Sequence, residues 1–98
     1  MPIYQVTPLA KNAPAIAGAV REHIDEGDYY ELANSAGWLV KFKGTTVELS
    51  HKLGITSPAL PPAPSTLGST MVVAITSYYG RGPTDMWEWL KTRFEAGA

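Results

Sequence analysis

A short run near the carboxyl end brings together the residue types that hold anions in proteins. It reads SYYGRGPTD, and its Gly80, Arg81 and Gly82 stand directly before an expected helix. Flexible glycines, a positive charge and the free N–H groups of a helix start together suit a phosphate group. Pro83 removes one donor, however, and Asp85 already places a negative charge in the first turn. We therefore predict a structural turn, with anion binding at Gly80, Arg81 and Gly82 as the alternative.

The two histidines lie in different expected helices, and neither forms a catalytic pattern. His23 has acidic neighbours at a spacing that does not suit a shared metal ion, whereas His51 follows Glu48 by three residues and can share its helix face. The residue pattern pairs neither histidine with an expected catalytic nucleophile. We expect no catalytic residue, no metal ligand and no cofactor, and we favour a protein that is not an enzyme.

Length and composition narrow the class of protein. The chain has 98 residues, which suits one domain, and its net charge of -1 disfavours electrostatic wrapping of DNA. The absence of cysteine removes disulfides and thiolate sites, and it fits a reducing compartment. No apolar run approaches the roughly 20 residues that span a bilayer. We expect a cytoplasmic protein with no membrane partner and with little affinity for nucleic acid.

The first part of the chain predicts a strand followed by a helix. PIYQVTP is bounded by prolines, which suit strand ends. Asn12 is the expected N-cap of the helix, Gly18 would allow close approach to a sheet, and Gly27 would end the helix in a left-handed conformation. Apolar residues recur every four positions on one face of this helix: Ile16, Val20 and Ile24.

The middle of the chain predicts a hairpin and a second helix. DYYELANSAGWLVKFK alternates apolar and polar residues, and its turn belongs at ANSAG because Asn34 and Gly37 tolerate positive φ. TTVELSHKLGI opens with Thr45 three residues before Glu48, which is a capping box. The same run closes with Gly54 before an apolar residue, as in a Schellman motif.

The last part predicts a loop, a strand and a final helix. Residues 56–70 hold four prolines and are interpreted as an exposed Pro-rich loop. MVVAITSYY is apolar on both faces, which is typical of a strand covered on both sides. The final helix is expected over residues 83–95. The whole order predicts an α+β fold, a ferredoxin-like β-α-β-β-α-β sandwich with an appended C-terminal helix and with its first and last strands in the centre.

The tryptophans of the final helix do not fit one face. Four apolar residues spaced three or four apart form one stripe: Met86, Trp87, Leu90 and Phe94. Trp89 lies about 200° around the helix from Trp87 and is expected on a second surface. Exposed aromatic side chains often anchor interfaces. Two interpretations stay open: a partly exposed tryptophan packed by its neighbours, or an interface that includes Trp89, Tyr78 and Tyr79.

A nucleic-acid function is the competing interpretation. The run TTVELSHKLGI is similar to the first helix of a helix-turn-helix, but the segment after it is rich in proline and free of lysine and arginine. A nucleic-acid-binding or nucleic-acid-processing ferredoxin-like module would instead use Arg81, His51 and Lys41 or Lys43 as ligands.

The runs SAGWLVKFKGTTVELSHKLGI and MVVAITSYYG carry a family resemblance. They resemble, over roughly half the chain, the strand-helix-strand core of small bacterial ferredoxin-fold proteins similar to the CRISPR-associated endoribonuclease family. The resemblance implies a homodimer with the last strand and C-terminal segment at the interface. It does not imply metal-dependent cleavage, because Thr7 stands where that family's metal-binding aspartate would be. We expect a non-catalytic interaction or regulatory domain that acts as a homodimer.

Overall fold

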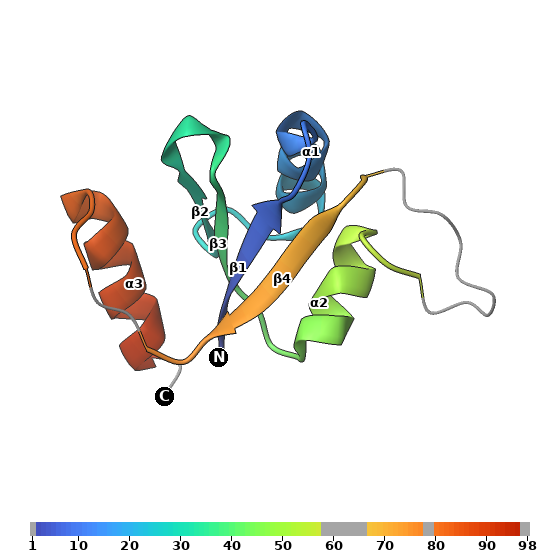
Figure 1. Cartoon of the computed structure of the whole chain (residues 1–98). Coiled ribbons are helices and arrows are strands. Elements are labelled where there is room, and N and C mark those ends of the chain that lie inside the picture. The colour runs from blue at the N-terminus through green and yellow to red at the C-terminus, as the bar shows by residue number, and fades with distance from the viewer. Residues whose placement is uncertain (1, 58–66, 78–79, 97–98) are drawn as a thin grey trace.

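The computed structural model describes residues 2–57, 67–77 and 80–96 (Figure 1), with only the backbone described at residues 35 and 94–96. It has a four-stranded antiparallel sheet and three helices, so the α+β class is confirmed. The elements in chain order are β1 (Ile3–Pro8), α1 (Ala13–His23), β2 (Tyr29–Leu32), the 3-10 turn η1 (Ala33–Ser35), β3 (Gly37–Lys41), α2 (Thr46–Leu53), β4 (Thr70–Ile75) and α3 (Thr84–Ala96).

The strand order is β2-β3-β1-β4, so β1 and β3 occupy the centre of the sheet. The expectation that the first and last strands are both central is therefore wrong for the last strand. β4 pairs with β1 alone among the described strands. Its apolar character on both faces has another cause: Val72 packs against the core under α1 and α2, while Ile75 packs against α3 on the opposite face.

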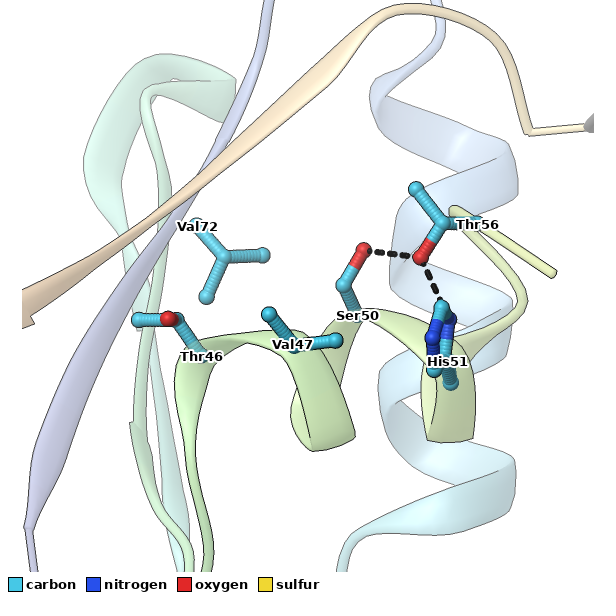
Figure 2. Close-up of a pocket in the computed structure, with 6 residues that line it drawn as sticks. All are labelled: Thr46, Val47, Ser50, His51, Thr56 and Val72. Carbon is cyan, nitrogen blue, oxygen red and sulfur yellow. Dashed lines mark hydrogen bonds between the residues drawn. The ribbon is translucent and has the colours of Figure 1, made fainter. Parts of the chain in front are cut away.

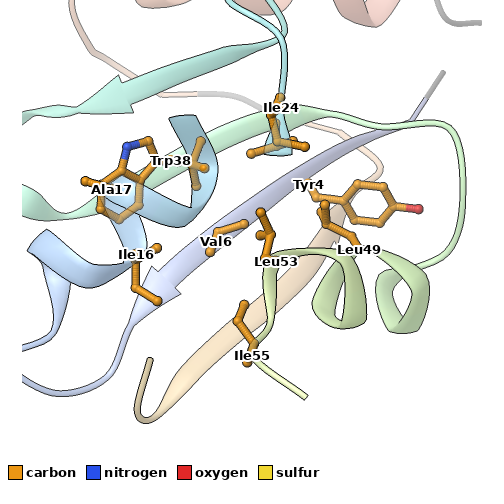
Figure 3. Close-up of a cluster of buried hydrophobic side chains, with 11 residues drawn as sticks. Tyr4, Val6, Ile16, Ala17, Ile24, Trp38, Leu49, Leu53 and Ile55 are labelled. Atoms are coloured by element: carbon orange, nitrogen blue, oxygen red, sulfur yellow. The ribbon is translucent and has the colours of Figure 1, made fainter. Parts of the chain in front are cut away.

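One face of the sheet is covered by α1 and α2, which lie side by side on it (Figure 1). The buried side chains between them and the sheet form the main core (Figure 3). Alternate residues of β1 and β3 supply its floor, as the period of two in a strand requires. The residues of this core are Tyr4, Val6, Ile16, Ala17, Val20, Ile24, Trp38, Val40, Leu49, Leu53 and Ile55.

The other face of the sheet is partly covered by α3 (Figure 1). Trp89 of α3 belongs to the buried cluster on that face. Trp89 is only 8% exposed and packs with Leu90, Ile3 and Leu39. The expectation that Trp89 lies on a second surface, outside the packed stripe of its helix, is therefore wrong. Its indole Nε1 donates a hydrogen bond to the Gly27 carbonyl oxygen at 3.2 Å, so the polar edge of the ring is satisfied on burial.

Arg93 contacts the same two residues, Gly27 and Trp89. Its Nε donates to the Gly27 carbonyl oxygen at 2.7 Å, and its guanidinium carbon lies 4.9 Å from the centre of the Trp89 ring. This stacking is the geometry of a cation–π contact. The stripe of α3 that faces the sheet is therefore centred on Trp89 and Leu90, with Met86 and Trp87 partly buried at its margin. Of the expected stripe, the side chain at position 94 lies outside the described part.

Three expectations for α1 need correction. Asn12 is the N-cap residue as expected, but its side chain makes no cap hydrogen bond, and its Oδ1 accepts from the Ala10 N–H at 3.2 Å. Its Nδ2 donates to the carbonyl oxygens of Leu67 at 2.7 Å and Ser69 at 3.0 Å, which ties the helix start to the start of β4. Gly18 is exposed, and a Cβ added to it would have nothing within 4 Å, so it permits no close approach to the sheet. Gly27 has φ 95°, but it lies in a turn beyond the helix end at His23.

The local signals of the middle segment are confirmed. Thr45 accepts from the Glu48 backbone N–H at 3.1 Å, and Glu48 accepts from the Thr45 N–H at 3.2 Å, which completes the capping box. Gly54 ends α2 with φ 85° and donates to the His51 carbonyl oxygen at 3.1 Å, as in a Schellman motif. In the hairpin turn, Asn34 and Gly37 both have positive φ.

The last segment agrees with its expected elements in part. β4 begins at Thr70 and ends at Ile75, earlier than the expected strand, and α3 covers Thr84–Ala96. Most of the Pro-rich loop, residues 58–66, lies outside the described residues, and so does most of the segment in which a helix-turn-helix would place its second helix. Of the helices that the structure describes, none has the length and apolar character needed to cross a membrane.

Candidate functional site

The outer edge of β4 carries backbone groups that no described strand pairs with. The Leu9 N–H donates to the Ser69 carbonyl oxygen at 2.9 Å, and the β1–β4 register places these two residues opposite each other. Hydrogen-bonded and non-hydrogen-bonded pairs alternate along an antiparallel ladder. The backbone groups of Thr70, Val72 and Ala74 therefore point away from β1, toward the free edge.

The opposite edge of the sheet, at β2, is shorter and charged. The Lys41 N–H donates to the Asp28 carbonyl oxygen at 2.7 Å, so by the same alternation Tyr29 and Glu31 carry the outward backbone groups. The Glu31 carboxylate lies 3.8 Å from the Arg21 guanidinium. Charge and shortness are the usual protections of an edge strand against pairing with another chain.

The β4 edge has none of these protections along its length. Its sequence is TMVVAI, six residues without a charge or a proline. Met71 is 47% exposed and Val73 is 37% exposed, both on the sheet face that α3 shares. α3 reaches Ile75 but leaves these two side chains uncovered. A long, apolar edge of this kind favours pairing with another strand.

A hollow of about 330 Å³ lies between α2 and β4, on the other face of the sheet (Figure 2). Val47 and Val72 point toward each other across it, and Val47 is 60% exposed. Polar side chains line its other side. The lining residues are Thr46, Val47, Ser50, His51, Thr56 and Val72.

Three of these polar side chains form a hydrogen-bonded chain. The Thr56 hydroxyl oxygen lies 2.8 Å from the Ser50 hydroxyl oxygen and 2.7 Å from the His51 Nδ1 (Figure 2). A hydroxyl beside an imidazole is the arrangement of an activated nucleophile. These three side chains lie at the C-terminal end of α2, however. The helix dipole is negative there and would destabilise a developing oxyanion. This arrangement suits a cap that holds the segment after α2 better than it suits catalysis.

The sequence did not show this cluster, although a signal for it was present. Thr56 reaches His51 because the Schellman turn at Gly54 folds the chain back over the last turn of α2. The turn itself was expected, but the sequence does not show which side chain after the turn contacts the helix. Within the described ranges, no three histidine, aspartate or glutamate side chains gather closely enough to hold a metal ion.

A second hollow, of about 290 Å³, collects charged side chains. It brings Lys41 and Lys43, the two lysines expected as nucleic-acid ligands, together with Lys52, which was not expected among them. Two carboxylates share the same hollow, so its charge is mixed. The charged and titratable residues are His23, Asp25, Asp28, Lys41, Lys43 and Lys52. His51 lines the hollow beside β4 instead.

The turn before α3 places Gly80, Arg81 and Gly82 at the surface. The Gly82 carbonyl oxygen accepts a hydrogen bond from the Trp87 Nε1 at 3.1 Å. This bond ties the turn to α3, as a structural role would require. Anion binding by these three residues stays a prediction. Tyr78 and Tyr79, expected at an interface, lie outside the described residues.

Asp85 in the first turn of α3 is already engaged. Its Oδ2 accepts a hydrogen bond from the Tyr30 hydroxyl at 2.9 Å, which links α3 to β2. This hydrogen bond, which stabilises the neutral phenol next to a carboxylate, raises the pKa of Tyr30 above its ordinary value. An anion at this helix start would have to approach a carboxylate that the fold holds in place.

Comparison of the chain with protein families, with curated proteins and with solved structures finds no match.

Proposed function

We propose that this chain is a non-catalytic interaction or regulatory domain that acts as a homodimer, joined along the free edge of β4. The observation that carries this proposal is the contrast between the two edges of the sheet. The β2 edge is short and bears the Glu31–Arg21 ion pair, whereas the β4 edge is longer, uncharged and apolar on its exposed face. Addition of a strand to such an edge supplies main-chain hydrogen bonds to the partner.

A second copy of the same chain suits this edge. Most homo-oligomers have two-fold symmetry, in which the same patch meets itself. Like charges that face each other across such an axis weaken the pairing of the two strands. β4 has no charged residue, so this repulsion does not arise. Met71 and Val73 supply apolar side chains on one face of the seam, and Val47 beside the hollow supplies one on the other.

The proposal also includes a ferredoxin-like arrangement of the fold and a cytoplasmic location. The order β-α-β-β-α-β, with two helices on one face, supports a ferredoxin-like arrangement to which α3 is appended. The proposal includes a likeness to small bacterial ferredoxin-fold proteins similar to the CRISPR-associated endoribonuclease family, but not that family's metal-dependent cleavage. The lack of cysteine supports a cytoplasmic location.

We expect Val73→Lys to weaken the dimer at least about tenfold, because the symmetry places two new ammonium groups in one uncharged seam. Val73 is already partly exposed, so the folded monomer tolerates the change. Sedimentation over a nanomolar-to-micromolar concentration series measures the dissociation constant. Ala15→Lys, which puts the same charge on the exposed face of α1, is the matched control and is expected to leave the constant unchanged. A wild-type chain that stays monomeric throughout the series would end the proposal.

A nucleic-acid-binding module is the second candidate, and the hollow with three lysines is what favours it. On this candidate, replacing Lys41, Lys43 and Lys52 together with glutamine weakens binding of short single-stranded RNA and flattens its dependence on salt. Fluorescence anisotropy at two salt concentrations measures both effects, with Lys11→Gln as the control. The carboxylates of Asp25 and Asp28 in the same hollow make this the weaker candidate, and absence of RNA binding by the wild-type chain removes it.

A further inference from the structure

We infer the register of the dimer: the two β4 strands pair antiparallel about Val72, so that Val72 of one copy lies opposite Val72 of the other. This inference rests on the proposed function, which requires only that the β4 edges meet. It adds which residues meet. The register follows from the symmetry of the pair, the direction of the backbone groups and the positions of the exposed side chains.

Symmetry limits the possible registers. Two identical antiparallel edge strands that extend one sheet are related by a two-fold axis perpendicular to that sheet, and such an axis keeps each face on its own side. Side chains alternate between faces along a strand. Residues that pair must therefore lie on the same face in both copies, and the axis must pass through one residue position rather than between two. The centre of the pair is thus Met71, Val72, Val73 or a residue nearer the strand ends.

The backbone selects among these centres. The outward hydrogen-bonding groups belong to Thr70, Val72 and Ala74, as the Leu9–Ser69 hydrogen bond and the β1–β4 register establish. With Val72 at the centre, Thr70 pairs with Ala74 of the second copy, and all three residues of each strand form hydrogen-bonded pairs. A centre at Met71 or Val73 leaves one of the three outside the strand-to-strand ladder. Val72 is therefore the centre that satisfies the whole edge within Thr70–Ile75.

The side chains favour the same centre. About Val72, Met71 of each copy lies opposite Val73 of the other, on the face that α3 leaves uncovered. These are non-hydrogen-bonded pairs, in which side chains approach most closely. Both exposed apolar residues of β4 are thereby covered by each other. With Val73 at the centre, Met71 would instead lie opposite Ile75, where α3 already packs.

On the opposite face, the same register brings the two Val72 side chains together at the inner wall of the hollow beside α2. Val47, exposed on the other wall of that hollow, then faces the seam. The hollow of each copy thus opens onto the two-fold axis. The partner copy completes an apolar surface that the single chain leaves open.

Single cysteines test the register directly, because the chain has no cysteine of its own. Val72→Cys places two thiols across a hydrogen-bonded pair with Cα atoms about 5.5 Å apart, within the range for a disulfide. In the Met71→Cys or the Val73→Cys variant, the Cα atoms of the two cysteines, one in each copy, lie about 8 Å apart. This distance follows from the rise per residue along a strand and the spacing between strands. We expect Val72→Cys to form a disulfide-linked dimer under mild oxidation at least about tenfold faster than either.

An equimolar mixture of Met71→Cys and Val73→Cys is a second, independent test. It is expected to form the mixed disulfide readily, since these positions lie opposite each other about Val72. Glu31→Cys, on the β2 edge, is the control for random collision and is expected to link slowly. Oxidation of Val72→Cys in concentrated urea is expected to give no more product than that control, because the link requires folded strands.

The outcomes separate the register from the function beneath it. Rapid linking through Val73→Cys alone, with slow linking through Val72→Cys, overturns the register and keeps the β4 dimer. A dimer in sedimentation that links through none of these β4 positions places the interface elsewhere and overturns both the register and the edge. A chain that is monomeric in sedimentation and links nowhere overturns the homodimer itself.

Discussion

Gly37→Ala is expected to lower the free energy of unfolding by about 3 kcal/mol or more, at the upper end of the cost of backbone strain at a single residue. Gly37 begins β3 with φ 141°, a conformation that disfavours a side chain. A Cβ there would lie 2.4 Å from the Val6 carbonyl oxygen, on the neighbouring central strand. Because that oxygen belongs to backbone at the centre of the sheet, it cannot move aside cheaply. Urea unfolding followed by tryptophan fluorescence measures the loss.

Gly18→Ala is the matched control for this substitution, with the opposite sign. Gly18 lies within α1, is exposed and has nothing within 4 Å of a Cβ. Alanine is preferred over glycine inside a helix by about 1 kcal/mol. We therefore expect Gly18→Ala to raise the unfolding free energy by up to that amount. Equal effects of the two substitutions would contradict the placement of Gly37 against β1.

Trp89→Ala is expected to cost about 3–5 kcal/mol of unfolding free energy, as large-to-small changes of buried aromatic residues do. The indole fills the second core between α3 and the sheet, and it packs against the Tyr30 ring at 6.3 Å between centroids. Its loss also leaves Arg93 without the ring over which its guanidinium lies. Loss of this core would release α3 from the sheet, and amide exchange in α3 is expected to rise accordingly.

Trp87→Ala is the comparison that makes this test specific. Trp87 is only partly buried, at the margin of the same core. We expect it to cost about 1 kcal/mol, in the range of ordinary substitutions outside a fully packed site. The sequence pattern alone predicted the reverse order, with Trp87 facing the core. A greater loss for Trp87→Ala than for Trp89→Ala would therefore show that α3 is rotated from its described position.

The features that were predictable from the sequence depend on neighbours along the chain. The capping box joins Thr45 to Glu48, three residues apart, and the turn of the hairpin depends on the positive φ that Asn34 and Gly37 accept. A hydrogen bond or a dihedral preference within a few residues acts before any distant contact forms. For this reason the helix starts, the turns and the order of elements followed from local residue types.

The features that were not predictable depend on residues far apart. Asn12 stands at the N-cap position as expected, but its Nδ2 donates to carbonyl oxygens near residue 67 and its Oδ1 accepts from the Ala10 N–H, so its side chain caps no N–H of the first turn. Trp89 looked surplus, but the Gly27 carbonyl oxygen and the open face of the sheet accommodate it. In both cases a side chain had two possible environments, and only the packed structure made one of them available.

For the candidate site on β4, too, one part was predictable from the sequence and another was not. The apolar sequence of β4 was visible in the chain, and it suggested an interface near the last strand. Whether those residues lay inside the sheet or at its edge depended on which strands took the two central places, and these are β1 and β3. The alternation of side chains along a strand is the same at the centre and at the edge of a sheet. The spacing of apolar residues in the sequence indicates which face of a strand is apolar. It does not indicate which strands pair with it, because the backbone hydrogen bonds between strands join segments that are distant in sequence and form only in the tertiary structure.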